Sequence, residues 1–344
     1  MDTISGLPYE LLVRILSLVQ LKVAVSTCIL SKRWKFFWMS LPKLDFTDRD
    51  ESLLVLKDFI NKNLPLHRAP FIESFLLSFW TFLILLIRKK TWFPTTYQKP
   101  FEALLSICPV LEDLEVSFRE DESIQEFTIN VTSLWKLCLH VSYYWSSLER
   151  YEIDTPCLEY LELADWIDSP CLVKNMPKLE KAHVDVVSFV VKNVIGSVTS
   201  VKHLTVCSED VYGDGIVFDQ LEHLKLCICK DDSSNVLAQF LKDSPNLRVL
   251  VISQLDLHAD LKTNEMGFWN HPSSVPECML AVLSTDFELG RLLYRDIAVY
   301  ILKNARHLRT SVLWANTNEH NVPNLEMIKG VVFPSFKHMR TCVY

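Results

Sequence analysis

Two pairs of histidine and cysteine residues have a spacing that could support metal chemistry. His203 and His223 occupy equivalent places in successive segments, and Cys207 and Cys227 each follow one of these histidines by four residues. Imidazole and thiolate groups are preferred ligands of zinc. Along an extended strand, however, residues spaced in this way lie roughly 13 Å apart, whereas zinc ligands lie within about 2.3 Å of the metal. We therefore expect ordinary surface histidines here, with no metal and no other cofactor.

Motifs for nucleophilic or nucleotide-dependent catalysis do not occur in the sequence. The chain has 7 glycines, and the close pair Gly213 and Gly215 is not followed by the spacing of a dinucleotide site or a P-loop. A nucleophile elbow, G-x-S-x-G, is also missing. A hydrolase or thiol enzyme is an alternative class, but it requires a nucleophile beside a base, and no motif supplies one. We expect a protein that is not an enzyme.

The composition bears on several other classes of function. A 49% hydrophobic share of 344 residues is enough to form a large core. The net charge of -7 argues against nucleic acid as a partner, because nucleic-acid-binding proteins usually present a basic face. The 10 cysteines are scattered, and Asp2 and Glu10 interrupt any secretory signal pattern. Reduced thiols are therefore expected, in a protein of the nucleus, the cytoplasm or both.

One apolar run, FLLSFWTFLILLI over residues 75–87, could be mistaken for a membrane span. It is 13 residues long and is bounded by Glu73 and by the basic trio 88–90. A spanning helix needs about 20 apolar residues. We expect a buried helix or strand rather than a membrane segment, with membrane association as the alternative.

The first 46 residues have the pattern of three short helices. Pro8 suits the first position of a helix that extends to about Val19, and its apolar residues form one stripe at a 3.6-residue period. These residues are Leu11, Leu12, Ile15, Leu16 and Val19. A second helix is expected over residues 22–29, and Ser31 is expected to cap a third that ends before Pro42.

A module this small rarely buries all its apolar residues internally, so part of its surface is expected to bind another protein. The alternative is that these residues only form a private core. Between Leu11 and Leu44 the sequence contains basic but no acidic residues, in a chain that is acidic as a whole. The basic residues are Arg14, Lys22, Lys32, Arg33, Lys35 and Lys43. The expected partner is therefore acidic.

The segments ISGLPYELLVRILSLV and AVSTCILSKRWKFFW together resemble the plant F-box. That pattern runs LP-x-E-L-L-x-x-I-L-S, then A-V-x-T-x-x-L-S-K-R-W, followed by an aromatic residue. The resemblance implies docking onto the acidic Skp-type adaptor of a cullin–RING ubiquitin ligase. The adaptor-binding residues expected from the resemblance and from the apolar stripe are Leu7, Pro8, Leu11, Ile15, Leu16, Leu30, Arg33 and Trp34.

An L-x-x-L-x-L hexad recurs through the middle of the chain. The hexads begin at Leu111, Leu134, Leu158, Leu179, Val201, Leu221 and Leu247, with spacings of 23, 24, 21, 22, 20 and 26 residues. These periods lie in or near the range of about 20 to 29 residues for leucine-rich repeats, in which each unit adds one strand to a curved parallel sheet. Proline often precedes the hexad, which suits a turn that leads into the strand.

Alternation along these strands predicts which side chains face a partner. The leucines point inward and the residues between them lie on the concave face. The target-binding residues expected on this face are Glu115, Tyr160, Glu162, His183, His203, His223 and Lys225. Such a face suits an extended polypeptide of mixed charge better than a small apolar ligand.

After residue 269 the hexad pattern stops, and the sequence predicts a strand, a helix over about 292–304 and a closing strand. The pieces VPECML and YILKNARHL resemble the FBD domain found at the end of many plant F-box proteins. The residues between them depart from that pattern, for example by lacking a tryptophan usual there. The segment is expected to cap the open end of the repeat sheet.

A larger departure lies between Asp48 and Lys99, where the family would place early repeats. The chain has instead the apolar run, the basic trio and TWFPTTYQKP. We hypothesise that this stretch replaces lost repeats through an altered splice or gene model.

The expected fold class is α/β: a small helical F-box, a short leucine-rich-repeat solenoid and a C-terminal FBD cap. The expected domains are 1–46 for the F-box, 47–100 for an irregular linker, 101–265 for the repeats and 266–344 for the cap. The resemblance implies a substrate receptor of an SCF-type ubiquitin ligase, which binds the adaptor through the F-box and an unknown protein target through the repeats. The alternative is a leucine-rich-repeat scaffold or a non-functional variant with no ligase role.

Overall fold

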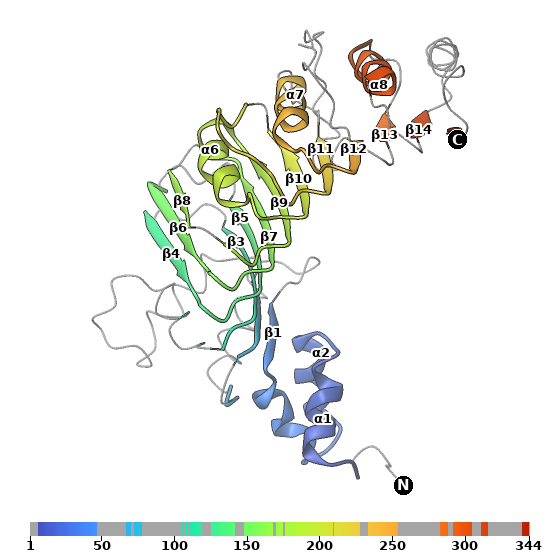
Figure 1. The fold of residues 1–344 in the computed structure, drawn as a ribbon. Helices are drawn as coiled ribbons and strands as arrows, with labels where there is room; N and C mark the ends of the chain where they lie inside the picture. The colour runs from blue at the N-terminus through green and yellow to red at the C-terminus, as the bar shows by residue number, and fades with distance from the viewer. Residues whose placement is uncertain are drawn as a thin grey trace. The chain divides into compact units, whose positions relative to one another are not determined.

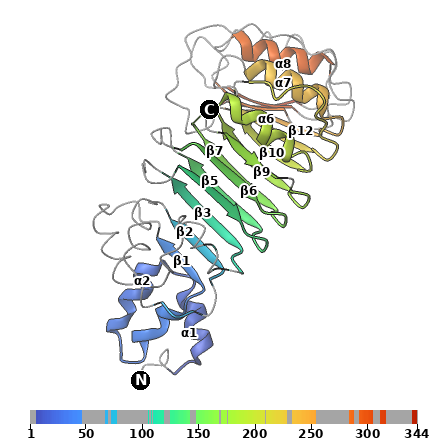
Figure 2. The ribbon, with the colours of Figure 1, turned by 90° about the vertical axis from the view of Figure 1, so that its left-hand side faces the viewer.

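The computed structural model describes a set of ranges along the chain: residues 6–46, 67–69, 72–77, 105, 108, 110–118, 125–141, 148–167, 170–174, 176–208, 210–227, 233–253, 283–287, 292–304, 311–315 and 339–343. The chain divides into two compact units, residues 1–158 and 159–344. Figure 1 and Figure 2 show the elements of both units from two sides.

The first unit begins with a helical module. Its helices are α1 (Tyr9–Leu16), α2 (Leu21–Ser26), the 3-10 turn η1 (Thr27–Ile29) and the 3-10 helix η2 (Trp34–Ser40). The first two predicted helices are confirmed, although α1 ends at Leu16 rather than near Val19. Just beyond this end the Ser17 amide and hydroxyl both donate to the carbonyl of Val13. The expected cap at Ser31 is wrong: η2 begins after Arg33 and has no side-chain cap.

A small core holds this module together. Its fully or nearly fully buried residues include Leu12, Leu16, Leu21, Ala24, Trp34, Phe37 and Trp38. The rings of Trp34 and Phe37 meet edge to face at 5.8 Å, a favourable aromatic geometry. Tyr9 adds a contact to Phe37 at 5.1 Å, which joins α1 to η2.

Parallel strands follow in the first unit. They are β1 (Lys43–Phe46), β2 (Ser74–Leu77), β3 (Asp113–Phe118) and β5 (Lys136–Val141), each paired with the next. A second pair, β4 (Glu126–Asn130) and β6 (Arg150–Asp154), is also parallel. The side chains of Phe118, Phe127 and Tyr151 stack in a chain of aromatic contacts at 4.5 and 5.2 Å. These contacts link β3 to β4 and β4 to β6.

Residues 67–68 close over the end of the helical module. The amide of Arg68 donates to the carbonyl of Met39, and the His67 ring donates to the carbonyl of Leu41 at 2.8 Å. Burial lowers the pKa of His67, partly offset by the bond to Leu41. This histidine is therefore kept neutral.

The second unit contains a longer run of parallel strands. Its order is β7 (Tyr160–Asp165), β9 (Lys181–Val186), β10 (His203–Cys207), β11 (His223–Cys227), β12 (Val249–Ser253), β13 (Leu283–Phe287), β14 (Ser311–Ala315) and β15 (Met339–Val343). A short strand, β8 (Cys171–Val173), lies outside this order. The helices are α6 (Ser188–Ser197), α7 (Ser233–Asp243) and α8 (Leu292–Asn304). Figures 1 and 2 show α6 and α7 on one side of the sheet.

The hexads predict these strands correctly. In the second unit the fourth positions of successive hexads are in register, with Leu161 beside Ala182, then Leu204, Leu224 and Leu250. All five are nearly completely buried. The sequence therefore identified both the parallel pairing and the inward face.

Each hexad is preceded by the same turn. The first hexad residue donates its amide to the carbonyl three positions earlier, as Leu158 does to Thr155, Leu179 to Met176 and Leu247 to Ser244. In these three turns the second residue is proline, namely Pro156, Pro177 and Pro245. Proline fits that position because its fixed φ matches the turn.

The strand, helix and strand expected near the C-terminus are confirmed. They are β13, α8 and β14, and α8 has the predicted bounds. Ile297 and Ile301, one turn apart, are its buried residues among the side chains described. The strand β15 was not expected. The irregular stretch between Asp48 and Lys99 lies mostly outside the described residues, apart from 67–69 and 72–77.

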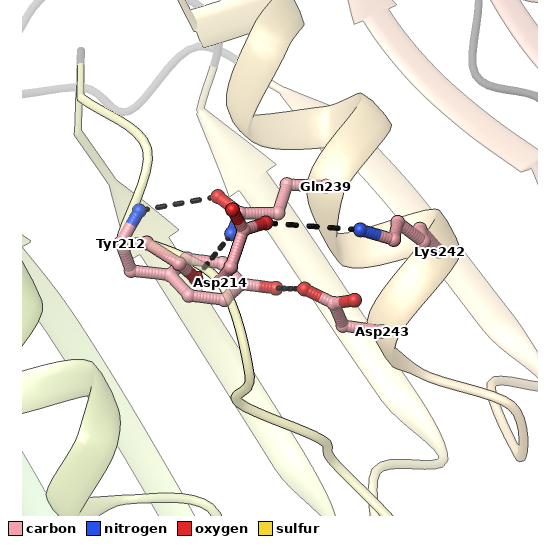
Figure 3. A network of polar contacts seen from close by, with 6 residues as sticks. Tyr212, Asp214, Gln239, Lys242 and Asp243 are labelled. Atoms are coloured by element: carbon pink, nitrogen blue, oxygen red, sulfur yellow. Dashed lines mark hydrogen bonds and ion pairs between the residues drawn. The ribbon is translucent and has the colours of Figure 1, made fainter.

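A buried tyrosine ties the loop after β10 to α7 (Figure 3). The Tyr212 side chain is fully buried, and its hydroxyl donates to a carboxylate oxygen of Asp243 at 3.1 Å. The Gln239 amide accepts from the Tyr212 N–H at 3.2 Å and donates to the Gly213 carbonyl at 2.6 Å. Gly213 has a φ of 91°, where a side chain would be strained. Burial, and then the nearby Asp243, raise the pKa of Tyr212, so the hydroxyl keeps its proton and remains a donor.

Removing this hydroxyl is expected to loosen the loop. Tyr212→Phe keeps the ring but leaves Asp243 without its donor, and we expect a loss of about 1–3 kcal/mol in the free energy of unfolding. Tyr9→Phe is the matched control, because Tyr9 is 46% exposed, and it should change stability by less than about 0.5 kcal/mol. Denaturant titration measures both, and equal effects would contradict the role of the network.

The core of the helical module gives a second stability prediction. Trp34 is 5% exposed and Leu30 is 66% exposed. Trp34→Ala should therefore cost about 3–5 kcal/mol through the cavity that it leaves, whereas Leu30→Ala should stay within about 0.5 kcal/mol of the wild type. Denaturant unfolding of the full chain, followed by tryptophan fluorescence and circular dichroism, separates the two variants. A Leu30→Ala protein as unstable as Trp34→Ala would show that Leu30 belongs to the core.

Candidate protein-binding surfaces

The helical module exposes far more apolar surface than its size explains. We call the following residues, which are between 42% and 87% exposed, the exposed apolar set: Tyr9, Leu11, Ile15, Leu18, Val19, Val23, Ile29, Leu30 and Phe36. Scattered exposed apolar residues are normal, but a dense group of them on one small module marks an interaction surface. The six basic side chains of this segment are also exposed, so the apolar surface has a cationic surround.

The structure places the predicted adaptor-binding residues in two groups. Pro8, Leu11, Ile15, Leu30 and Arg33 are exposed, and Leu7 is half-buried. Leu16 and Trp34, in contrast, are buried at 3% and 5% exposure and form part of the module's own core. A buried side chain supports a surface without touching a partner, so these two residues act on binding through the fold.

Arg33 connects the two ends of the module. Its guanidinium donates to the carbonyl of Leu7 and lies 5.9 Å from the centre of the Phe37 ring. The arginine therefore positions the Leu7-Pro8 segment against η2 in addition to contributing positive charge. Sequence reasoning assigned it a binding role alone.

Several exposed residues were missed by the sequence reasoning. Leu18, Ile29 and Phe36 are 83%, 87% and 51% exposed. Leu18 and Ile29 lie at or just beyond a helix end, and Phe36 lies within the 3-10 helix η2, so a 3.6-residue stripe does not predict the direction of any of the three. The signal that could have found them is the total apolar content of the module, which exceeds what its buried positions can hold.

A second candidate surface lies on the side of the second unit's sheet opposite its buried leucines. We call the residues of two aligned rows the strand face. The first row is Tyr160, Lys181, His203, His223 and Val249, and the second is Glu162, His183, Thr205, Lys225 and Val251. These side chains are half-exposed or exposed, whereas Leu204, Val206, Leu224 and Leu226 between them are buried. The strand face contains six of the seven predicted target-binding residues.

Polar and ring contacts organise the strand face. The Tyr160 hydroxyl donates to Glu162 at 3.0 Å, and the Lys181 ammonium lies 5.5 Å from the Tyr160 ring centre. The rings of His203 and His223 stack with centroids 4.4 Å apart. Burial lowers the pKa of His223, and the neighbouring His203 adds to this effect. The stacked neighbour therefore disfavours a proton on His223.

Glu115, the seventh predicted target-binding residue, lies in the first unit. Its register partners are Leu76 on β2 and Cys138 on β5. Two residues earlier on the same strands, Asp113 and Lys136 form an ion pair, with the Lys136 ammonium 3.3 Å from an Asp113 oxygen. Glu115 thus lies on β3 of the first unit, and the strand face is defined within the second unit without it.

The histidine and cysteine pairs that suggested zinc differ in their surroundings. His203 and His223 reach solvent, whereas Cys207 and Cys227 are fully buried. Among the residues that the structure describes, no group of three or more His, Cys, Asp or Glu side chains could hold a metal ion. In the first unit, burial raises the pKa of the Cys108 thiol to about 11, which makes it a poor nucleophile.

The apolar run over residues 75–87 is described only at its start. Residues 75–77 belong to β2, and Phe75 is 2% exposed. The remainder of the run lies outside the described residues. Within the described part of the chain, no helix has the length and apolar character needed to span a membrane.

Comparison with known proteins identifies the relatives of this chain. Residues 4–46 match the F-box domain family. An FBD-associated F-box protein of Arabidopsis thaliana is 46% identical, over 96% of this chain and 98% of its own length. A putative FBD-associated F-box protein of the same plant is 45% identical over 96% and 95%, and a putative F-box/FBD/LRR-repeat protein is 30% identical over 99% of both.

The match at residues 4–46 coincides with the helical module that carries the exposed apolar set. An F-box domain implies a Skp-type adaptor as partner. Because relatives this similar cover nearly its whole length, the chain belongs to the plant family of FBD-associated F-box and F-box/FBD/LRR-repeat proteins.

Proposed function

We propose that this protein is the substrate-recognition subunit of an SCF-type cullin–RING ubiquitin ligase. Its F-box holds a Skp-type adaptor, and its repeats hold a protein target. The observation that carries the proposal is the exposed apolar set with its basic surround, within the residues that match the F-box domain. The membership of this chain in the F-box/FBD family is consistent with a role as a ligase receptor.

The adaptor-binding surface is apolar at its centre and charged at its margin. Pro8, Leu11, Ile15 and Leu30 supply apolar area that water no longer covers once a partner binds, at about 25 cal/mol per Å². The surrounding lysines and arginines favour an acidic partner and speed its approach. Leu16 and Trp34 hold this surface in shape from within the core.

The target-binding part is a leucine-rich-repeat solenoid. Two observations support this assignment: the hexads align in parallel register, and the same hydrogen-bonded turn precedes successive strands. We assign residues 101–265 to the repeats and 266–344 to the FBD cap, with 1–46 as the F-box and 47–100 as the irregular linker. The cap assignment is supported by the order of β13, α8 and β14.

In this function the chain does no bond chemistry of its own. The receptor holds a target near a ubiquitin-charged enzyme. Ubiquitin transfer is faster because the effective concentration of the target at that enzyme is raised. A non-catalytic receptor of this kind acts in the nucleus, the cytoplasm or both. It needs no cofactor.

One specific observation favours a second reading, that of a scaffold or a product with no ligase role. The alignment with the 46% identical relative extends over 404 residues, more than the 344 of this chain. The relative therefore has residues that find no counterpart here. We place this loss in segment 47–100, where the sequence departs from the family pattern.

Transcript sequencing tests the loss of repeats. We expect transcripts from the same locus that encode additional hexads between the F-box and Leu111, because an altered splice or gene model would remove them from this version alone. A single expressed, uninterrupted reading frame that matches this sequence would contradict the hypothesis and make the short form the native product.

Adaptor binding tests the leading function. Purified full chain is mixed with a plant Skp-type adaptor, and Leu7→Ala/Pro8→Ala and Leu30→Ala are compared with the wild type in pull-down and calorimetry. Truncation of a central interface residue costs about 2 kcal/mol, which corresponds to roughly 30-fold weaker binding. Leu172→Ala is the matched control, because Leu172 is also an exposed leucine, at 55%, but lies on β8.

The outcomes separate the two functions. The ligase-receptor function is supported if the wild type binds the adaptor, if Leu30→Ala and the double variant bind more weakly, and if Leu172→Ala binds like the wild type. A folded wild type that fails to bind the adaptor moves the scaffold function to first place. Circular dichroism of each variant ensures that a loss of binding does not come from unfolding.

A further inference from the structure

The strand face has a net positive charge that its own contacts do not cancel. Lys181 and Lys225 are exposed on β9 and β11, and the described acidic residue in its two rows is Glu162. Glu162 lies at one side, accepts a hydrogen bond from Tyr160 and is in register with His183. The centre of the face, on β9 to β11, therefore presents two lysines and the stacked pair of His203 and His223. Asp185, two residues beyond His183 on the same side of β9, is buried and accepts a hydrogen bond from Trp166 at 3.1 Å.

The charged residues beside the strand face are largely paired with each other. At the starts of the strands, Lys202 contacts Glu180 at 3.0 Å and Arg248 contacts Glu222 at 3.5 Å. These two pairs balance in charge. An exposed Glu159 precedes β7, at the same side as Glu162. Hence the positive charge of β9 to β11 is left for a partner.

The stacked histidines add a charge that depends on pH. Around them lie Lys181 on β9, Lys202 before β10, and Glu222 and Lys225 on the β11 segment, with Arg248 before β12. Burial, and then His203 and Arg248, lower the pKa of His223, whereas Glu222 raises it. An anion bound over the pair would reverse this balance, because a carboxylate stabilises both imidazolium rings. Binding of an anion and uptake of protons are therefore coupled.

We propose that the strand face recognises an extended acidic segment of the target protein, and that protonation of its histidines strengthens this binding. The proposal rests on the proposed function, since it names the class of target that the receptor selects. With neutral histidines, the two lysines outweigh the one glutamate of the two rows, and a proton on the stacked histidine pair adds to that charge.

The geometry of the face suits an extended peptide. Neighbouring strands are about 4.8 Å apart, and the two rows are separated by about 6.6 to 7 Å along each strand. A chain that crosses the strands between the rows meets basic groups on both sides, such as His203 in one row and Lys225 in the other. Nucleic acid is less suited, because a chain of net charge -7 with two lysines on the face offers few phosphate contacts.

A peptide selection tests the chemistry of the target. The full chain in complex with the adaptor is used to select from a phage-displayed library of random peptides, with counter-selection on Lys181→Glu/Lys225→Glu. We expect a recovered pool enriched in Asp and Glu, whose members bind the reversed variant at least tenfold more weakly. Lys192→Glu is the matched control, because Lys192 is an exposed lysine on α6 rather than on the strand face, and it should retain binding.

A pH series tests the histidines separately. The strongest selected peptide should bind about tenfold more tightly near pH 6 than near pH 8, since a pKa change of one unit corresponds to a tenfold effect. The substitution His203→Gln/His223→Gln should remove most of this pH dependence and keep the affinity measured near pH 8. A variant peptide with Gln for Glu should lose the pH dependence as well. Thermal unfolding of each protein checks that the fold is retained.

Several results would overturn the inference. They are a pool with no acidic enrichment, a selection that recovers no peptide sensitive to Lys181→Glu/Lys225→Glu, and an unchanged pH dependence in the histidine variant. Single-stranded oligonucleotides that displace the peptide in a lysine-dependent way would indicate a nucleic-acid face instead. Adaptor binding is measured in the same preparations, so that loss of the F-box function alone is distinguished from failure of this inference.

Discussion

The rest of the structure depends on one constraint, which is that each parallel strand must satisfy the backbone groups at the start of its neighbour. In the second unit the carbonyl of Glu180 accepts from the amides of Lys202 and His203, and the carbonyl of Lys202 accepts in turn from Glu222 and His223. The same pattern recurs in the first unit, where the Glu112 carbonyl accepts from Trp135 and Lys136. Buried backbone groups without partners are costly, so each strand is held in one register. That register aligns the leucines on one face and the polar rows on the other.

The helical module obeys a different constraint, because it is too small to bury what it contains. Leu12, Ala24 and Phe37 are almost fully buried, yet Leu18 and Ile29 are more than four-fifths exposed. A partner surface relieves this exposure, whereas a larger private core would need more chain. The residues that form the core, such as Trp34, are therefore largely distinct from the exposed residues, such as Leu30, that offer apolar surface to a partner.

Local patterns in the sequence predicted the elements that depend on local physics. The hexads located the strands, proline marked their turns, and the helix Leu292–Asn304 was found from its apolar stripe. Contacts between distant residues escaped this reasoning. Tyr212 bonds to Gln239 and Asp243, which are 27 and 31 positions away, and no spacing rule connects them. Ser31 has the right type for a cap, but the chain there continues through turns and η2 begins after Arg33, so the expectation failed.

The two proposed binding surfaces use different physics, and this difference suits the proposed receptor, which must keep one partner and release another. Burial of the apolar set depends little on salt and favours a lasting contact with the adaptor. The strand face acts through lysines and histidines, whose attraction to an acidic segment is screened by salt and mainly speeds encounter. His223 stacks on His203, and its pKa is lowered when no anion is bound. It therefore loses a proton gained on binding once the anion leaves. Because a modified target has to leave before the next one binds, a charge-based and exchangeable contact on the repeats fits turnover better than an apolar one.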